Sequence, residues 1–235
     1  MDIGTLIEYD RQLLLWLNGS HSLFLDGLFM TLTTATTWIP LYVSLFLLVV
    51  RNSDSVKKIM VIVACAGLCV LLAGTIDDEL VKPMVARWRP TRDPQIGSLV
   101  DVVNGYRSGQ YGFFSAHASN TFSIAVFFCW LVRSRLLSVS LVLWSLVNCW
   151  TRLYLGVHFP IDILVGLAWG GCCGTAVYMI YRRFVPQTVY GARANHPSPL
   201  TSTGYQFSDV DTVVVVLLLT VVYALLRSCL FLYAN

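Results

Sequence analysis

Long apolar runs separated by short polar connections dominate the pattern along the chain. Six stretches reach or approach the length of about 20 apolar residues that an α-helix needs to cross a membrane. They are residues 24–50, 59–81, 115–133, 136–152, 160–181 and 210–232. The pattern predicts an all-α fold, an integral membrane bundle of six transmembrane helices that forms a single domain over residues 1–235.

A segment with apolar residues at roughly helical spacing precedes the first run. These residues are Ile3, Leu6, Ile7, Leu13, Leu14 and Leu17. The spacing predicts an N-terminal amphipathic helix that lies in the membrane interface. The segment has acidic residues early and no basic region before its apolar residues, so we do not expect a cleavable signal peptide.

Three of the runs carry features that predict local structure. Pro40 lies inside the long first run and predicts a bend. Gly166, Gly170 and Gly174 of the fifth run form a ridge of small residues, which fits close helix packing either within the chain or in a dimer. Arg227 interrupts the last run, and we expect its side chain to extend to the membrane surface.

The composition agrees with a chain that lies mostly in lipid. Hydrophobic residues make up 56% of the chain and charged residues 12%, whereas soluble domains usually carry about 25% charged residues. The net charge of +3 does not indicate a nucleic-acid partner. All seven cysteines fall in apolar stretches without metal-type spacing, so we interpret them as packing residues.

The connections between the runs alternate between the two membrane faces. Basic residues follow the first, third and fifth runs, and the positive-inside rule makes this face cytoplasmic. The opposite face holds the connection 82–114 and the turn 153–159, and it also has eight basic residues, several of which we interpret as ligand-binding. The orientation therefore depends partly on the functional interpretation. The residues of the first group are Arg51, Lys57, Lys58, Arg133, Arg135, Arg182, Arg183 and Arg193.

Three polar clusters, at residues 82–90, 114–117 and 151–162, fall on that second face by helix parity. Lys82, Arg89 and Arg152 are cations beside apolar helices, where a charge costs roughly 2.5–3.5 kcal/mol at mid-membrane and less near the surface. Three such cations favour an anion, and guanidinium groups suit phosphate oxygens. The clusters therefore predict a site for a lipid phosphate.

The same clusters contain candidates for nucleophilic chemistry. His158 and Asp162 are four residues apart, so a helix would place them on one face. A carboxylate beside a histidine fixes its tautomer and stabilises the charge that develops when the other ring nitrogen attacks. His117 is well suited to protonate the departing oxygen. Ser115 offers a hydroxyl, and the N–H groups of a helix that begins there would point at the anion.

Taken together, the clusters resemble the three signature motifs of the type 2 phosphatidic acid phosphatase family, in order and spacing, across residues 59–181. Three positions depart from the family pattern: Phe114 replaces proline, Ala116 replaces glycine and Thr151 replaces serine. The matching residues are Lys82, Arg89 and Pro90 in the first motif, Ser115 and His117 in the second, and Arg152, His158 and Asp162 in the third.

The resemblance implies a two-step displacement without a metal or other cofactor. His158 would attack phosphorus and form a phosphohistidine, Asp162 would orient His158, and His117 would protonate the leaving group and then activate water. The residues that would hold the phosphoryl oxygens are Lys82, Arg89, Ser115, Ala116 and Arg152.

Other readings of these residues stay open. His117, His158 and Asp162 could form a metal site. Tyr106 and Arg107 either contact the substrate head group or belong to a solvated loop. Surface charge is the favoured interpretation of Arg87 and Arg92, a structural role is favoured for Asp77, Asp78 and Glu79, and His21 and His196 are interpreted as incidental.

The particular lipid is less defined than the chemistry. The short chain resembles small bacterial family members that act on undecaprenyl diphosphate, which is the first-choice substrate. A lipid A phosphatase or a phosphatidylglycerol phosphate phosphatase is the alternative, and a non-catalytic lipid-phosphate binder or transporter is the alternative from another class. The expected location is the bacterial inner membrane, with the site facing the periplasm, and the expected partners are the lipid substrate and the bilayer.

Overall fold

The computed structural model describes residues 2–185 and 199–234, and this part of the chain is helical. Its only β structure is two isolated bridges, so the prediction of an all-α fold is confirmed. Arg193 and His196 lie outside the described residues. The main helices are α1 (Ile3–Leu17), α2 (Leu23–Thr33), α3 (Ile39–Arg51), α4 (Val56–Val70), α5 (Lys82–Val85), α6 (Ala116–Val132), α7 (Arg135–Tyr154), α8 (Pro160–Phe184) and α9 (Phe207–Ala234).

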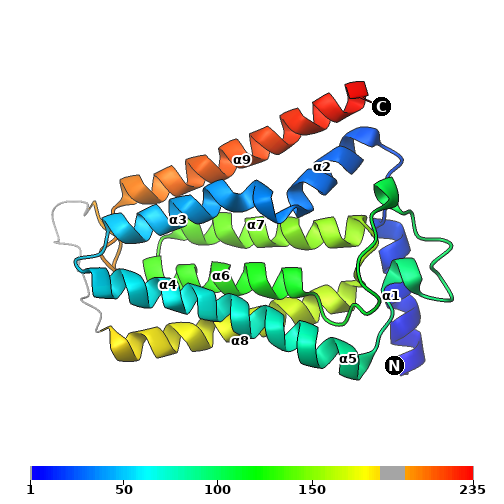
Figure 1. Ribbon diagram of the computed structural model, residues 1–235, viewed down its shortest axis with the longest axis horizontal. Coiled ribbons are helices and arrows are strands. Elements are labelled where there is room, and N and C mark those ends of the chain that lie inside the picture. The colour runs from blue at the N-terminus through cyan, green and yellow to red at the C-terminus, as the bar shows by residue number, and fades with distance from the viewer. Residues whose placement is uncertain (1, 186–198, 235) are drawn as a thin grey trace.

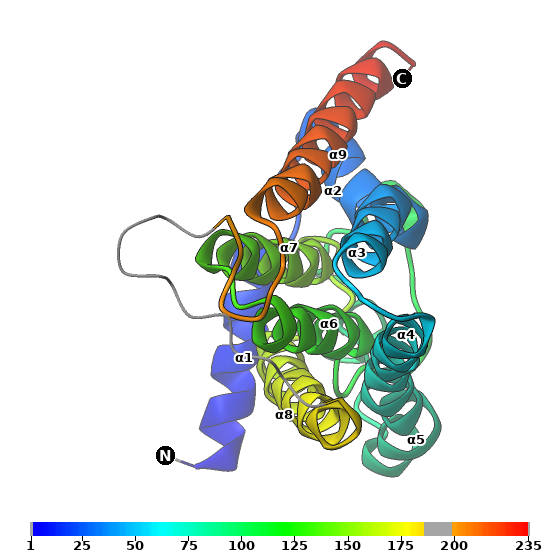
Figure 2. The ribbon, with the colours of Figure 1, turned by 90° about the vertical axis from the view of Figure 1, so that its left-hand side faces the viewer.

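The helices form a bundle whose long axis is horizontal in Figure 1, with α1 lying across one end. The view along the bundle in Figure 2 shows α6 between α7, α8 and α4, and α9 packed on the side of α2 and α3. The connection between α5 and α6 gathers at the same end as α1. This end is therefore where the polar clusters of the sequence meet.

Four helical segments are long and apolar enough to cross a membrane. They are Val56–Val85, Arg135–Tyr154, Pro160–Phe184 and Phe207–Leu230. The pair formed by α2 and the segment Ala35–Arg51 makes a fifth if it is one span bent by 69°. Helix α6 is apolar but has only 17 residues. The chain is thus a multi-pass membrane protein, while the predicted span 115–133 corresponds to this shorter helix.

The bend in the first run is real, but the helix breaks before Pro40. Helix α2 ends at Thr33, and Pro40 lies in the first turn of α3, where its missing N–H costs no hydrogen bond. The Thr37 hydroxyl donates to the Thr31 carbonyl at 2.7 Å, and the Trp38 indole donates to the Leu32 carbonyl at 2.9 Å. These side chains satisfy carbonyl groups that the break leaves without helical partners.

The second span changes its winding as it approaches the polar end of the bundle. Helix α4 continues through two π-helical segments, Leu71–Thr75 and Asp77–Val81, and then through α5. Such wide turns inside α-helices frequently occur at functional sites. The span ends at Ala86, which has a positive φ of 48°. The π-helical segment ends directly before Lys82, the first residue of the predicted site.

The glycine ridge of α8 packs against the backbone of α6. A Cβ atom added at Gly166 would lie 2.7 Å from the carbonyl oxygen of Ser115, and one at Gly170 or Gly174 would meet the carbonyl oxygens of Ser119 or Ser123. The ridge is therefore used for packing within the chain. Because the contacts repeat every four residues on both helices, they also set the register of α6 against α8.

We expect Gly170→Ala to destabilise the protein by about 3 kcal/mol, because overpacking a close helix contact forces the two backbones apart. The matched control is Gly67→Ala, since an added Cβ at Gly67 meets no atom within 4 Å. Unfolding measured in detergent compares the two variants. Equal stability of both would contradict the packing role of the ridge.

Candidate active site

The structure brings the three polar clusters together at the end of the bundle that α1 crosses. The first and third clusters meet where Nη1 of Arg89 lies 2.8 Å from Nε2 of His158. The second and third meet where the backbone N–H of Ser115 donates to the carbonyl oxygen of Asp162 at 3.1 Å. Residues 69 positions apart in the sequence thus share one site.

His158 is buried in the turn between α7 and α8. Because the Arg89 guanidinium can only donate, Nε2 of His158 accepts and carries the lone pair. Nδ1 faces Oδ2 of Asp162 at 3.6 Å. Burial first, and then the positive charges of Arg89, Arg152 and Lys82, hold the pKa of His158 well below its ordinary value. The imidazole is therefore neutral, which is the form that a nucleophile requires.

Asp162 is fully buried and fixed from two directions. Its Oδ2 accepts from the backbone N–H of Phe159 at 3.0 Å, so the side chain caps the start of its own helix. Its Oδ1 accepts from Nη1 of Arg87 at 2.7 Å. The carboxylate is thereby held in place beside His158.

Arg87 is not the surface charge that the sequence favoured. Its guanidinium bridges two buried carboxylates, because Nη2 also donates to Oδ2 of Asp10 at 2.6 Å. It stacks over the ring of Phe159 at 4.2 Å. The other oxygen of Asp10 accepts from the backbone N–H of Ile161 at 2.9 Å, in the first turn of α8. Arg87 and Asp10 thus connect α1 to Asp162.

Arg89 and Arg152 are the two buried cations of the site that have no carboxylate within 4 Å in the described part of the chain. Arg89 also donates to the carbonyl of Val157 at 3.0 Å, and Arg152 donates to the hydroxyl groups of Thr33 at 2.6 Å and Tyr106 at 3.1 Å. The Nε atoms of both arginines are buried and have no hydrogen-bond partner.

Burial, followed by the charge of Arg152, lowers the pKa of Arg89 to about 10, so that Arg89 stays positive near neutral pH. Two adjacent cations without counter-charges are costly to bury. Bidentate guanidinium groups in such a place favour binding of an anion such as phosphate.

Lys82 differs from the two arginines, because it is already neutralised. Its Nζ lies 2.7 Å from Oδ2 of Asp77 and also pairs with Asp78. Asp77 is buried, and its other oxygen accepts from the backbone N–H of Phe114 at 3.0 Å. The family motif has proline at this position, and proline could not donate this hydrogen bond. Phe114 therefore ties the second cluster to the first in a way that the family pattern does not.

The start of α6 provides the remaining predicted residues. Ser115 is fully buried, and its hydroxyl accepts from the N–H of Ala118 at 3.4 Å as the N-cap of the helix. Ala116 and His117 form the first turn of α6 and are only partly buried. The backbone of His117 therefore lies two residues from the buried Ser115, at the same end of α6.

The two residues predicted for the substrate head group differ in position. Tyr106 contacts Arg152 through its hydroxyl and through its ring, whose centroid lies 5.6 Å from the guanidinium carbon. Arg107 is exposed and donates to the carbonyl of Thr91 at 2.8 Å, so it fastens the loop. Arg92 is exposed as well and donates to Ser108. Of these residues, only Tyr106 is part of the site.

The sequence analysis did not single out Asp10 or Thr33. An acidic residue in an amphipathic helix is normally interpreted as part of its polar face, and one threonine in a Thr-rich run carries no signal of its own. The contacts of both are made with residues more than 70 positions away. In the described part of the chain, no group of three or more His, Cys, Asp and Glu side chains is placed to hold a metal ion.

A helical membrane bundle with a buried neutral histidine between a carboxylate and unpaired guanidinium groups defines the class of the protein, a membrane phosphatase. The model of the PAP2 superfamily matches residues 55–186, which is more than half of the chain. The chain belongs to this superfamily, and it is a phosphatase, a hydrolase of phosphoric esters.

Two curated relatives are similar over most of their lengths. A lipid A 4'-phosphatase of Bacteroides thetaiotaomicron is 34% identical over 231 residues, covering 96% of this chain and 100% of the relative. A lipid A 4'-phosphatase of Porphyromonas gingivalis is 33% identical over 195 residues, covering 82% of this chain and 81% of the relative. No solved structure matches the chain. The relatives support the alternative of the sequence analysis, a lipid A phosphatase, and give no support to undecaprenyl diphosphate.

Proposed function

We propose that the protein is a lipid A 4'-phosphatase that acts through a phosphohistidine on His158. The observation that carries the chemistry is the contact of Nε2 of buried His158 with Nη1 of Arg89 at 2.8 Å, which requires the lone pair on Nε2. The support for the lipid is the similarity to two lipid A 4'-phosphatases, one of them matched over its whole length.

The first step of the proposed reaction is the attack of Nε2 of His158 on phosphorus. The bond between phosphorus and the ester oxygen breaks, and that oxygen leaves with a proton from His117. Asp162 faces Nδ1 of His158 and stabilises the positive charge of the phosphorylated ring. In the second step, His117 takes a proton from water, the water oxygen attacks phosphorus, and phosphate leaves with His158 restored.

The phosphoryl oxygens are held by groups that already converge at the site. Arg89 turns from Nε2 of His158 to a phosphoryl oxygen when the substrate binds, which frees the lone pair for attack. Arg152, Lys82, the Ser115 hydroxyl and the Ala116 N–H complete the set. Donors placed in advance around the charge that develops in the transition state are usually the largest catalytic term.

The proposed setting is the bacterial inner membrane, with six spans and the site on the periplasmic face. In this proposal α6 also crosses the membrane and brings the number of spans to six, although it has only 17 residues. Helix α1 lies in the interface, because it crosses the end of the bundle and exposes apolar side chains such as Ile3, Leu6 and Trp16. The substrate phosphate would be found at this depth.

Phosphate release by the purified protein in detergent with excess EDTA tests the proposal. We expect release from lipid A with the 1-phosphate left intact, as read by phosphorus NMR or mass spectrometry. Undecaprenyl diphosphate, phosphatidylglycerol phosphate and phosphatidic acid are the comparison substrates. Faster release from one of these would assign another lipid. Binding of every lipid without release would favour the non-catalytic alternative, and loss of activity in EDTA would favour a metal site.

A further inference from the structure

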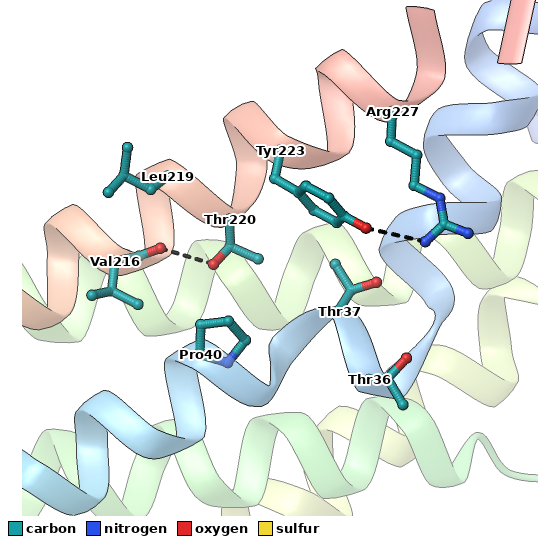
Figure 3. Close-up of a pocket in the computed structure, with 8 residues that line it drawn as sticks. All are labelled: Thr36, Thr37, Pro40, Val216, Leu219, Thr220, Tyr223 and Arg227. Carbon is teal, nitrogen blue, oxygen red and sulfur yellow. Dashed lines mark hydrogen bonds between the residues drawn. The ribbon is translucent and has the colours of Figure 1, made fainter. Parts of the chain in front are cut away.

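A cavity of about 520 Å³ lies between α9 and the break that separates α2 from α3 (Figure 3). One end of the cavity is apolar and is lined by Pro40 and Leu219. The other end is polar and is lined by Thr36, Tyr223 and Arg227. A cavity with one polar and one apolar end has the character of an amphiphile binding site rather than of a gap between packed helices.

Arg227 also lines a second cavity of about 400 Å³, together with Met30, Thr34 and Asn104. The sequence analysis predicted that the Arg227 side chain extends to the membrane surface. In Figure 3 the Arg227 side chain lies beside Tyr223, on the side of α9 that faces α2, and Arg227 is exposed. Its Nη1 donates to the hydroxyl of Tyr223 at 3.3 Å, and no carboxylate of the described residues lies within 4 Å of it. Arg227 is exposed and lies near the end of the span, so its guanidinium is accessible to an anionic group at the membrane surface.

The second cavity is lined by residues of the two segments that carry the hydroxyl partners of Arg152. Thr34 lines it, and the neighbouring Thr33 accepts from Nη1 of Arg152 at 2.6 Å. Asn104 lines it from the loop that also carries Tyr106, the other hydroxyl partner of Arg152. Arg227 is the residue that the two cavities share, and the second cavity is lined by residues next in the sequence, or close, to the hydroxyl partners of Arg152.

We propose that these cavities bind a second acidic group of the substrate lipid on Arg227, with an acyl chain of the same lipid lying against Pro40 and Leu219. The proposal rests on the proposed function and adds to it a site that recognises the lipid away from the scissile phosphate. The occupant follows from charge complementarity at Arg227, which both cavities share, and from the mixed polar and apolar lining of the first cavity. A lipid with phosphate at both ends of a disaccharide, as in lipid A, has this chemistry.

The test compares lipid A with its analogue that lacks the 1-phosphate, using wild type, Arg227→Gln and Arg227→Lys. We expect the ratio of kcat/KM for the two lipids to fall about tenfold in Arg227→Gln, mainly through KM, and to be largely kept in Arg227→Lys. A tenfold loss corresponds to about 1.4 kcal/mol of binding free energy. The matched control is Arg183→Gln, which removes an exposed cation from the far end of α8 and keeps the ratio.

An unchanged ratio in Arg227→Gln would overturn the proposal. If the wild type releases no phosphate from either lipid, the proposed function fails, and the same comparison is then made by binding to the His158→Ala protein. An affinity loss of about tenfold for the bisphosphorylated lipid in the Arg227→Gln background supports the second site. Equal affinity with and without Arg227 overturns it.

Discussion

Replacing His158 by alanine is expected to lower phosphate release by about four orders of magnitude or more, since removal of a nucleophile leaves only binding and electrostatic terms. The cations Arg89 and Arg152 stay in place, so binding of the phosphate lipid should be largely retained. Phosphate release and lipid binding, measured on the same purified sample, separate the two effects.

The matched control for this change is His21→Asn. His21 is an exposed histidine with a positive φ of 56°, a conformation that asparagine tolerates. This variant should release phosphate like the wild type. Substantial turnover in His158→Ala would remove His158 as the nucleophile, and loss of lipid binding in the same variant would show that it acts mainly in holding the site together.

Replacing Arg87 by glutamine is expected to have the second largest effect, although Arg87 is not one of the residues that the family motifs specify. Asp162 and Asp10 would lose the cation that they share, at a cost of about 3 kcal/mol in the free energy of unfolding. Asp162 would then hold the ring of His158 less firmly in its orientation, so we expect kcat to fall by about 10- to 100-fold. The measurements are unfolding in detergent and steady-state kinetics.

The neighbouring Arg92→Gln is the control, because Arg92 is exposed and contacts only the loop carbonyl of Ser108. Adding Asp10→Asn to Arg87→Gln should recover part of the lost stability, since one of the two uncompensated carboxylates is then gone. Strictly additive effects of the two changes would argue against a shared ion pair.

The sequence contained enough to predict the helical membrane bundle and the meeting of three polar clusters at one end. Hydrophobic run length and helix parity determine which connections share a face, and no tertiary detail is needed for that. The position of the break in the first run was harder to predict from the sequence. The break depends on Thr37 and Trp38, whose side chains donate to carbonyl groups of α2. Pro40 is the obvious candidate for a break in the sequence, but it fits the first turn of α3.

The network behind the site could not be predicted for a related reason. Arg87 and Asp10 resemble ordinary surface charges in the sequence, and only the fold places Asp10 against the start of α8. The identity of the lipid could not be predicted from the motifs either. Residues that bind phosphate recognise only the phosphate group, which all candidate substrates share. Similarity over the whole chain, including residues outside 59–181, is what favours lipid A.

Helix α1 connects the candidate active site to the expected membrane surface. Its apolar residues anchor it at the bilayer surface under the proposed placement, and Asp10 joins it through Arg87 to Asp162 beside His158. In that placement, and with His158 as the proposed nucleophile, the depth of the attacking nitrogen below the lipid head groups would be set by a helix rather than by a loop. We therefore expect an enzyme placed in this way to select phosphates by their depth as well as their chemistry, so that a change in bilayer thickness would alter which phosphate it reaches.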